Sequence, residues 1–181
     1  MATYYDQNKY NSLRETYHFF RFQRYDYTLE NEHLSVKYYF SLDDKYFFTP
    51  SFDIPKRKFY DFNNLNNSQL DVILFNIGMI ELISYWKLAC PKRVYIQPFK
   101  LDDNQIRWWK KLYFNGLGEF FYLNGIKENV NDFMEIINES EKSCDKINIQ
   151  LKESALVPVG GGKDSVVTLE LLKNKMPIIP L

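Results

Sequence analysis

A glycine-rich stretch near the end of the chain decides how the residues around it are expected to fold: Ala155-Leu156-Val157-Pro158-Val159, then Gly160-Gly161-Gly162-Lys163-Asp164-Ser165, then Val166-Val167-Thr168-Leu169-Glu170-Leu171-Leu172-Lys173. We interpret the three parts as a short apolar strand, a glycine turn and an amphipathic helix. In such a unit, glycines let backbone N–H groups turn toward a ligand, and the helix N-terminus adds unpaired amides and the positive end of its dipole. Lys163 adds a positive charge, and Asp164 and Ser165 suit the first turn of the helix. The stretch is therefore predicted to bind phosphate.

The spacing of the glycines excludes two common phosphate-binding motifs. The P-loop requires a glycine five residues before Gly-Lys and a Ser or Thr directly after the lysine, but Val157 and Asp164 stand there. The dinucleotide fingerprint requires a final glycine that this stretch lacks. Residues 160–165 instead resemble the PP-loop of ATP pyrophosphatases, Ser-Gly-Gly-x-Asp-Ser followed by Ser or Thr, with Gly160 and Val166 as the two departures. The alternative is a glycine-rich turn that binds nothing.

The composition predicts a chain with a real hydrophobic core and no net charge. Of the 181 residues, 45% are hydrophobic and 18% aromatic, which suits one or two domains. Lysine and arginine number 23, and so do aspartate and glutamate. Because the chain lacks the positive charge typical of nucleic-acid-binding proteins, no nucleic-acid partner is expected.

The cysteines, the histidines and the apolar runs favour a cytoplasmic protein and offer no set of cysteine and histidine metal ligands. Cys90 and Cys144 are far apart in the sequence, and we expect both to be reduced cytosolic thiols. His18 and His33 have no acidic or cysteine partner at a useful spacing, so neither is expected to be a ligand. The N-terminus lacks the features of a signal peptide, and the most apolar run, residues 72–83, is too short for a bilayer. No membrane partner is expected.

The first third of the chain predicts an antiparallel meander. Residues 1–16 are polar without a clear period and are expected to be an irregular lead-in. Aromatic and β-branched residues then alternate in runs at 18–25, 34–40 and 46–49, separated by Asn- and Asp-containing turns. These aromatic side chains are expected to pack in a core against a helix, in preference to stacking on nucleic-acid bases.

A first long helix is predicted to be central. Residues 66–68 cap it, and it runs from about Gln69 to Ala89, where Cys90-Pro91 stops it. Its other faces are also largely apolar. The residues at helical spacing are Leu70, Ile73, Leu74, Ile77, Ile80 and Ile83.

A short strand at 93–96 and a second long helix follow. That helix begins after Asp102-Asp103-Asn104, covers residues 105–114 and leads into Gly116 and Gly118. Two glycines so close are costly in a helix unless a neighbouring helix or a ligand approaches there, and the residues leave both explanations open. Residues 127–153 are expected to form a solvated helix and a connector, with a domain boundary near 140–152.

Three segments in this order carry a wider resemblance: residues 83–91 (Ile-Ser-Tyr-Trp-Lys-Leu-Ala-Cys-Pro), 112–125 (Leu-Tyr-Phe-Asn-Gly-Leu-Gly-Glu-Phe-Phe-Tyr-Leu-Asn-Gly) and 157–165 (Val-Pro-Val-Gly-Gly-Gly-Lys-Asp-Ser). Over roughly residues 17–181 the chain resembles the N-terminal part of the UDP-N-acetylmuramoyl-L-alanyl-L-glutamate epimerases of peptidoglycan synthesis. The triple glycine is similar to that family's own loop. The resemblance implies an isomerase that uses ATP and Mg²⁺ to invert the terminal L-glutamate of its nucleotide-activated muramoyl dipeptide to D-glutamate, through an acyl adenylate, with release of AMP and pyrophosphate.

The resemblance also implies roles for particular residues. Those expected to bind ATP are Gly160, Gly161, Gly162, Lys163, Asp164 and Ser165. Asp164 is expected to cap the helix or to lie close to the Mg²⁺ ion. Lys87 and Glu119 are candidates for the acid/base pair, because they lie in the family-like segments.

The predicted architecture is an α+β N-terminal domain at residues 1–150, in which an antiparallel meander is joined by two long helices. The first strand, loop and helix of an α/β PP-loop domain, of the adenine nucleotide alpha hydrolase type, are expected at 151–181. Because residues 176–181 look like the start of another strand, we expect the chain to be the N-terminal part of a longer enzyme or to need a second subunit. Two other functions stay open: a different PP-loop adenylating enzyme, either amide-forming or base-modifying, and a truncated non-catalytic binding or interaction module.

Overall fold

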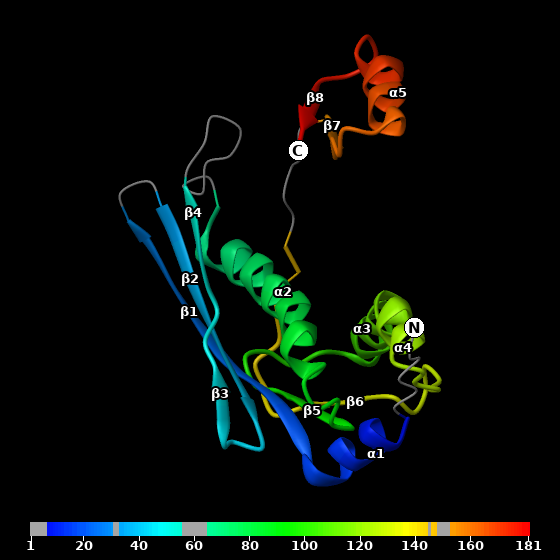
Figure 1. The fold of residues 1–181 in the computed structure, drawn as a ribbon. Helices are drawn as coiled ribbons and strands as arrows, with labels where there is room; N and C mark the ends of the chain where they lie inside the picture. Colours follow the sequence, from blue (N-terminus) through cyan, green and yellow to red (C-terminus); the bar gives the residue numbers. More distant parts are fainter. Residues whose placement is uncertain (1–6, 31–32, 56–64, 145, 148–152) are drawn as a thin grey trace. The chain divides into compact units, whose positions relative to one another are not determined.

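The computed structural model describes residues 7–30, 33–55, 65–144, 146–147 and 153–181. The chain divides into two compact units, and the division falls after Ile147. In the first unit helices lie against a sheet, whereas the second unit is one helix beside two short strands (Figure 1). No helix among the described residues combines the length and the apolar character that crossing a membrane requires.

The first unit is built on a six-stranded mixed sheet with the order β3-β2-β1-β5-β6, in which β4 also pairs with β2. The strands are β1 (Phe19–Glu30), β2 (His33–Leu42), β3 (Tyr46–Phe48), β4 (Ser51–Pro55), β5 (Arg93–Ile96) and β6 (Glu135–Asn138). β1 to β4 pair antiparallel, so the predicted meander is confirmed. On the other side of β1, β5 and β6 add in parallel. The prediction of a solvated helix and connector at 127–153 is wrong at β6, because its short apolar run pairs with β5 and buries Ile136.

A bulge in β1 keeps Phe20, Phe22, Tyr25 and Tyr27 on one face. The pairing register with β2 shifts between Phe22 and Arg24. Phe20 and Phe22 before the shift are fully buried, and Tyr25 and Tyr27 after it also pack against the core. One extra residue in a strand reverses which face the following side chains occupy. The bulge therefore explains why the aromatic alternation in the sequence changes from even to odd positions.

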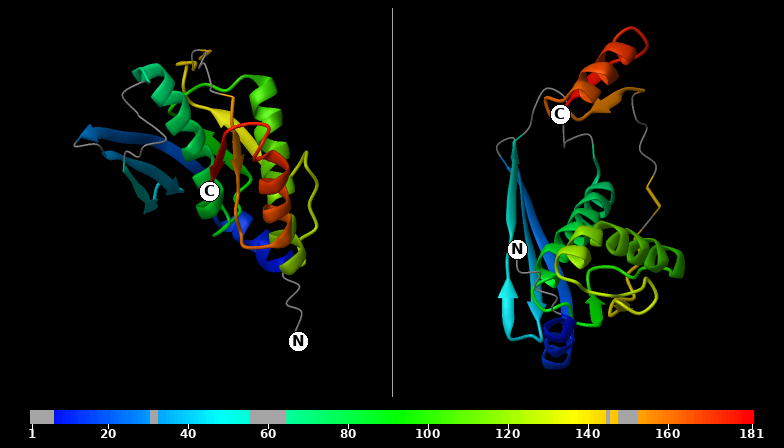
Figure 2. Two further views of the ribbon diagram at one scale, coloured as in Figure 1. Left: turned by 90° about the horizontal axis from the view of Figure 1, so that it is seen from above. Right: turned by 45° about the vertical axis from the view of Figure 1, so that its right-hand side comes forward.

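Helix α2 (Asn67–Trp86) lies across one face of the sheet and contacts β1 and β2 (Figure 2). It begins as predicted: the Asn66 side chain accepts a hydrogen bond from the Gln69 backbone N–H, and the Gln69 side chain accepts one from the Asn66 N–H. It ends at Trp86, earlier than predicted, and Cys90 takes a φ of 51° in the turn beyond. Of the residues named at helical spacing, Leu70 and Leu74 are buried, and Ile77 and Ile83 pack against the core, whereas Ile80 is 52% exposed. The other buried side chains of the helix are Phe75, Met79, Leu82 and Trp86.

Gly78 is where the backbone of α2 comes closest to the sheet. A Cβ atom built on Gly78 would lie 2.5 Å from Cζ of Phe22 and 2.7 Å from Cε1 of Tyr38. Two aromatic rings of the sheet therefore occupy the space that any larger residue needs. The Tyr38 hydroxyl also donates a hydrogen bond of 2.9 Å to the Leu74 carbonyl of the same helix.

Helix α1 (Gln7–Thr16) occupies a segment that was predicted to be irregular, so that prediction is wrong for residues 7–16; residues 1–6 lie outside the described ones. Its polar sequence gives little periodic signal, and its position depends on Arg14. The Nη1 atom of Arg14 donates to the Tyr10 hydroxyl at 2.7 Å, to the Cys90 carbonyl at 2.9 Å and to the Phe133 carbonyl at 2.8 Å. These bonds attach α1 to the turn after α2 and to the segment that precedes β6.

Helices α3 (Asp103–Gly116) and α4 (Gly118–Leu123) complete the first unit. Asp102 caps α3 through reciprocal hydrogen bonds with Gln105, as the sequence predicted for this start. A Cβ atom on Gly116 or Gly118 would meet no described atom within 4 Å. Close packing of a neighbouring helix against these glycines, one of the two explanations considered, is therefore wrong for the described residues. The glycines instead lie at the break between α3 and α4.

The second unit contains the strand, loop and helix predicted from the glycine-rich stretch. β7 (Ala155–Val157) leads through the glycines into α5 (Lys163–Leu172), and β8 (Ile178–Pro180) returns parallel to β7. The strand predicted within 176–181 is thus present. No residue of α5 is buried, and Val157 is buried among the described residues of this unit.

The close approach at Gly78 gives a first prediction. Replacing Gly78 by Ala should lower the free energy of unfolding by about 1–3 kcal/mol, because the new methyl group forces the Phe22 and Tyr38 rings to move. Gly116→Ala is the matched control: it adds a methyl group in open space and should leave stability unchanged or raise it by up to about 1 kcal/mol. Urea denaturation measures both changes, and equal stabilities for the two variants would contradict the prediction.

The hydrogen bonds of Arg14 give a second prediction. Arg14→Ala should destabilise the first unit by about 2–4 kcal/mol, because charged hydrogen bonds are lost and two backbone carbonyls lose a donor. Replacing the exposed Lys111 of α3 by Ala should change stability by less than about 0.5 kcal/mol. Thermal unfolding followed by circular dichroism compares them. A change for Arg14→Ala as small as that of the Lys111 variant would show that α1 does not depend on these bonds.

Candidate functional site

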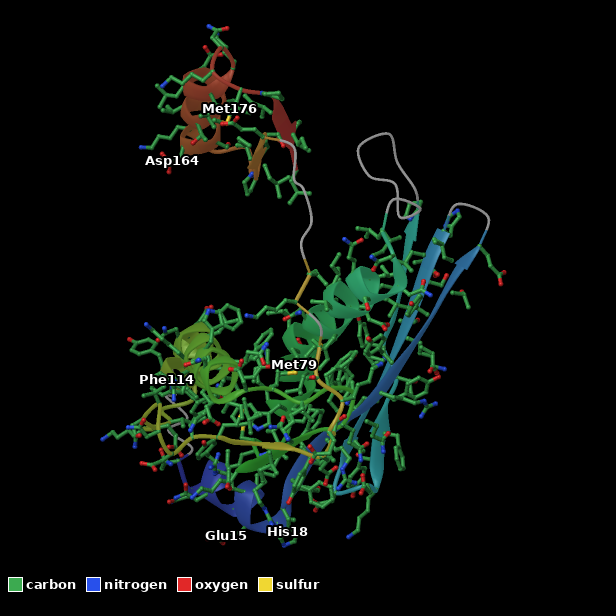
Figure 3. The ribbon with its side chains drawn as sticks, turned by 180° about the vertical axis from the view of Figure 1, so that it is seen from behind. Glu15, His18, Met79, Phe114, Asp164 and Met176 are labelled. Atoms are coloured by element: carbon green, nitrogen blue, oxygen red, sulfur yellow. The ribbon has the colours of Figure 1, made fainter. Side chains whose placement is uncertain are left out.

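The glycine turn leaves the N-terminus of α5 open. Gly161 has a φ of 76°, a left-handed conformation that favours glycine, and Gly162 is the N-cap residue in an extended conformation. No side chain caps α5, so the amides of its first turn keep their capacity to bind an anion. Asp164 lies in this first turn (Figure 3). Lys163 and Asp164 are both exposed.

Nothing in the described protein packs against the three glycines. A Cβ atom on Gly160, Gly161 or Gly162 would meet no described atom within 4 Å. The left-handed φ explains glycine at position 161, but neither conformation nor packing explains the other two. Glycines in an open turn let a ligand approach the backbone closely. The Ser165 hydroxyl donates to the Gly162 carbonyl at 2.7 Å, which fixes the turn where it enters the helix.

These residues fit a polyphosphate better than they fit a metal ion alone. An uncapped helix start, an accessible glycine backbone and the exposed Lys163 suit phosphate oxygens. Among the described residues no cluster of three or more His, Cys, Asp or Glu side chains could hold a metal. Mg²⁺ in nucleotide sites is commonly held by one or two carboxylates together with phosphate oxygens, so Asp164 alone would not hold the ion without a bound nucleotide.

The two predicted acid/base candidates lie at neighbouring elements of the first unit. Lys87 is the C-cap residue of α2 and is exposed. It lines a hollow of about 250 Å³ together with Cys90 of the following turn and Phe120 of α4. Glu119 precedes Phe120 in the first turn of α4 and is also exposed. The structure therefore brings Lys87 and α4 to one hollow, although Glu119 itself does not line it.

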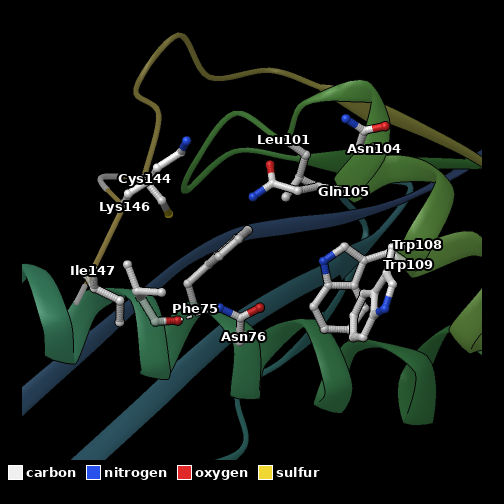
Figure 4. Close-up of a pocket in the computed structure, with 11 residues that line it drawn as sticks. Phe75, Asn76, Leu101, Asn104, Gln105, Trp108, Trp109, Cys144, Lys146 and Ile147 are labelled. Atoms are coloured by element: carbon white, nitrogen blue, oxygen red, sulfur yellow. Dashed lines mark hydrogen bonds between the residues drawn. The ribbon is translucent and has the colours of Figure 1, made fainter. Parts of the chain in front are cut away.

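A larger hollow, of about 460 Å³, lies between α2 and α3 and was not predicted from the sequence. Figure 4 shows the two indoles at one end, Lys146 and Cys144 at the other, and Phe75 and Asn76 between them. Trp109 is 4% exposed and belongs to the core, whereas Trp108 is 56% exposed. The two rings stand edge to face with centroids 4.8 Å apart.

The sequence carries one signal for this hollow. Adjacent residues of a helix point about 100° apart, so two neighbouring tryptophans cannot both be buried on one face. A capped amphipathic helix with the pair Trp108-Trp109 therefore predicts one tryptophan in the core and one at the surface. The lining residues Lys146 and Ile147 come from a segment that was predicted only as a connector, so the rest of the hollow had no sequence signal.

The two cysteines, both described, differ in their surroundings and neither forms a disulfide. Cys90 is buried next to Arg14, and burial raises the pKa of its thiol to about 12. Cys144 is half-buried and lines the larger hollow. Because the thiolate is the nucleophile, the two thiols should differ in reactivity.

The sequence is similar to known proteins over most of its length. The family model described as the MurL N-terminal domain matches residues 11–179. The UDP-N-acetyl-alpha-D-muramoyl-L-alanyl-L-glutamate epimerase of Xanthomonas oryzae pv. oryzae (strain MAFF 311018) is 30% identical over 98 residues, which is 54% of this chain and 21% of that protein. The matched region thus spans about a fifth of that relative's length. No solved structure matches.

The contrast between the thiols predicts their labelling. At pH 8 iodoacetamide should modify Cys144 at least about tenfold faster than Cys90, because Cys90 is both buried and protonated. Mass spectrometry of the digested protein, sampled over time, measures the two rates. In urea the two cysteines should react at similar rates, which serves as the control. Equal rates in the folded protein would contradict the described burial of Cys90.

Proposed function

The chain belongs to the MurL N-terminal domain family, and on that ground we propose that it is the N-terminal part of a cytoplasmic, ATP-dependent epimerase of peptidoglycan precursor synthesis. Its substrate is the nucleotide-activated muramoyl dipeptide named for the Xanthomonas relative, and the reaction inverts the terminal L-glutamate. The observation that carries the ATP dependence is the open glycine turn before the uncapped start of α5. It lies inside the family match.

The reaction needs activation because a hydrogen next to a carboxylate anion is a very weak acid. ATP, when bound with Mg²⁺, supplies the adenylyl group that converts the terminal carboxylate to an acyl adenylate, with loss of pyrophosphate. The backbone amides of Gly161 and Gly162 would hold the β- and γ-phosphates, and the Lys163 ammonium would offset the charge that develops on them. Ser165 holds the turn in place, and Asp164 would supply a carboxylate for the metal.

Inversion then needs one group to remove the α-proton and a second to return a proton on the opposite face. Lys87 and Glu119 remain the proposed pair. Lys87 borders a hollow that α4 also lines, and Glu119 lies in the first turn of α4. A proton can pass to and from solvent at both side chains because both are exposed.

The role of the loop is tested on the native protein isolated from its own cells. AMP release should depend on the UDP-linked muramoyl dipeptide, and Lys163→Ala should lower its rate by about 10²–10³-fold, as expected when one group that stabilises developing charge is lost. Lys173→Ala is the matched control, because Lys173 lies at the other end of α5 and pairs with Glu170. Its rate should stay within about twofold of the unchanged protein.

Three outcomes of this assay would contradict the proposal. An unchanged rate of AMP release for Lys163→Ala would show that the glycine turn does not bind the phosphates of ATP. AMP release that follows free amino acids or tRNA instead of the muramoyl dipeptide would favour another adenylating enzyme. The absence of AMP release with every substrate would favour a non-catalytic binding module.

A further inference from the structure

The hollow between α2 and α3 presents an aromatic face that the proposed chemistry does not use. Trp108 lines it with more than half of its surface exposed. The ring of Trp109 stands edge-on to the ring of Trp108, with an interplanar angle of 83°, and Trp109 itself packs in the core. The Trp108 ring is thus supported from one side and open to the hollow. A supported, open indole is a stacking surface for a flat ring.

Three side-chain amides line the same hollow, and their hydrogen bonds leave a defined set of atoms for a ligand. Asn76 uses its NH₂ group to donate to the Val72 carbonyl at 2.7 Å. Gln105 uses its carbonyl to accept from the Asp102 N–H at 2.8 Å, and Asn104 uses its carbonyl to accept from Arg107. These bonds leave unused the Asn76 carbonyl, one N–H of Asn76, and both N–H donors of Asn104 and of Gln105.

We propose that this hollow binds the uracil ring of the nucleotide-activated substrate, stacked on Trp108. The edge of uracil presents acceptor, donor, acceptor, and the amides that line the hollow offer both N–H donors for its carbonyls and the Asn76 carbonyl as an acceptor for its N–H. The inference rests on the proposed function, because that function supplies the uridine diphosphate.

The size and charge of the hollow fit one end of this substrate. Ligand pockets hold about 300–1,000 Å³, and the 460 Å³ of this hollow suits a nucleoside but not a whole UDP-linked muramoyl dipeptide. Lys146 lies at the end opposite the indoles, where its ammonium is placed for a phosphate attached to the ribose (Figure 4). The glycine turn, which is proposed for ATP, lies in the other unit of the chain.

The test is a titration of the 181-residue chain with UMP, followed by calorimetry and by the NMR signals of its three indole N–H groups. UMP should shift the signals of Trp108 and Trp109. The signal of Trp86, which is buried and donates to the Pro91 carbonyl, should not move. Trp108→Ala should weaken UMP binding by about 5- to 100-fold, whereas Trp108→Phe, which keeps a flat ring, should stay within about threefold.

Lys111→Ala, an exposed change on the same helix, is the matched control and should bind UMP as the unchanged chain does. Circular dichroism shows whether each variant is folded, and because Trp108 is exposed its replacements should be. The inference is overturned if UMP does not bind, if Trp108→Ala binds it equally well, or if ATP competes for the site as strongly as UDP does.

The inference and the proposed function fail separately. UMP binding can be measured without turnover. If UMP binding depends on Trp108 but the protein has no epimerase activity, the proposed function is wrong and the uridine nucleotide site is supported. Conversely, if the Trp108→Ala variant epimerises the UDP-linked substrate with an unchanged KM, the proposed function is supported and the uracil site is wrong.

Discussion

The contact between Gly78 and the rings of Phe22 and Tyr38 sets how closely α2 lies on the sheet, and the rest of the first unit depends on that distance. With α2 this close, the Tyr38 hydroxyl reaches the Leu74 carbonyl from the sheet side. From α3, the buried Tyr113 hydroxyl reaches the Met79 carbonyl at 2.6 Å. Helix α2 thus lies between Tyr38 and Tyr113, and Tyr25 of β1 also donates to its backbone, at the Asp71 carbonyl. Buried hydroxyls need such partners, so the same bonds also satisfy these side chains.

The position of α2 in turn determines what α3 can present. Tyr113 and Trp109 face α2 and the core, so Trp108, one residue earlier, must point outward beside the hollow. The capping pair of Asp102 and Gln105 fixes where α3 begins, and it also orients the Gln105 amide at the rim. Residues that stabilise the fold therefore place the groups that line the hollow.

Much of this arrangement could be predicted where the signal is local. The capping side chains of Asn66 and Asp102 marked both helix starts, and the glycines at 160–162 marked the turn before α5. Helix α1 could not be predicted, because its place depends on Arg14 bonding to residues 76 and 119 positions away. Strand β6 could not be predicted for a similar reason, because four residues in a polar region become a strand through parallel pairing with β5. The hollow between α2 and α3 combines residues from distant segments, and the tryptophan pair is the one local sequence signal that we find for it.

The two halves of β1 should differ in how often they open. Up to Phe22 the strand pairs with β2 on one side and β5 on the other, whereas beyond the bulge its described pairing is with β2 alone. Opening the inner half disrupts two ladders and buried core contacts, but opening the outer half disrupts a ribbon of β1, β2 and β4. Native-state amide hydrogen exchange resolves such differences as separate opening free energies. The inner amides of β1 should exchange only through global unfolding, and the amides beyond the Tyr25–Tyr38 pair through a smaller fluctuation that leaves α2 and its contact at Gly78 intact.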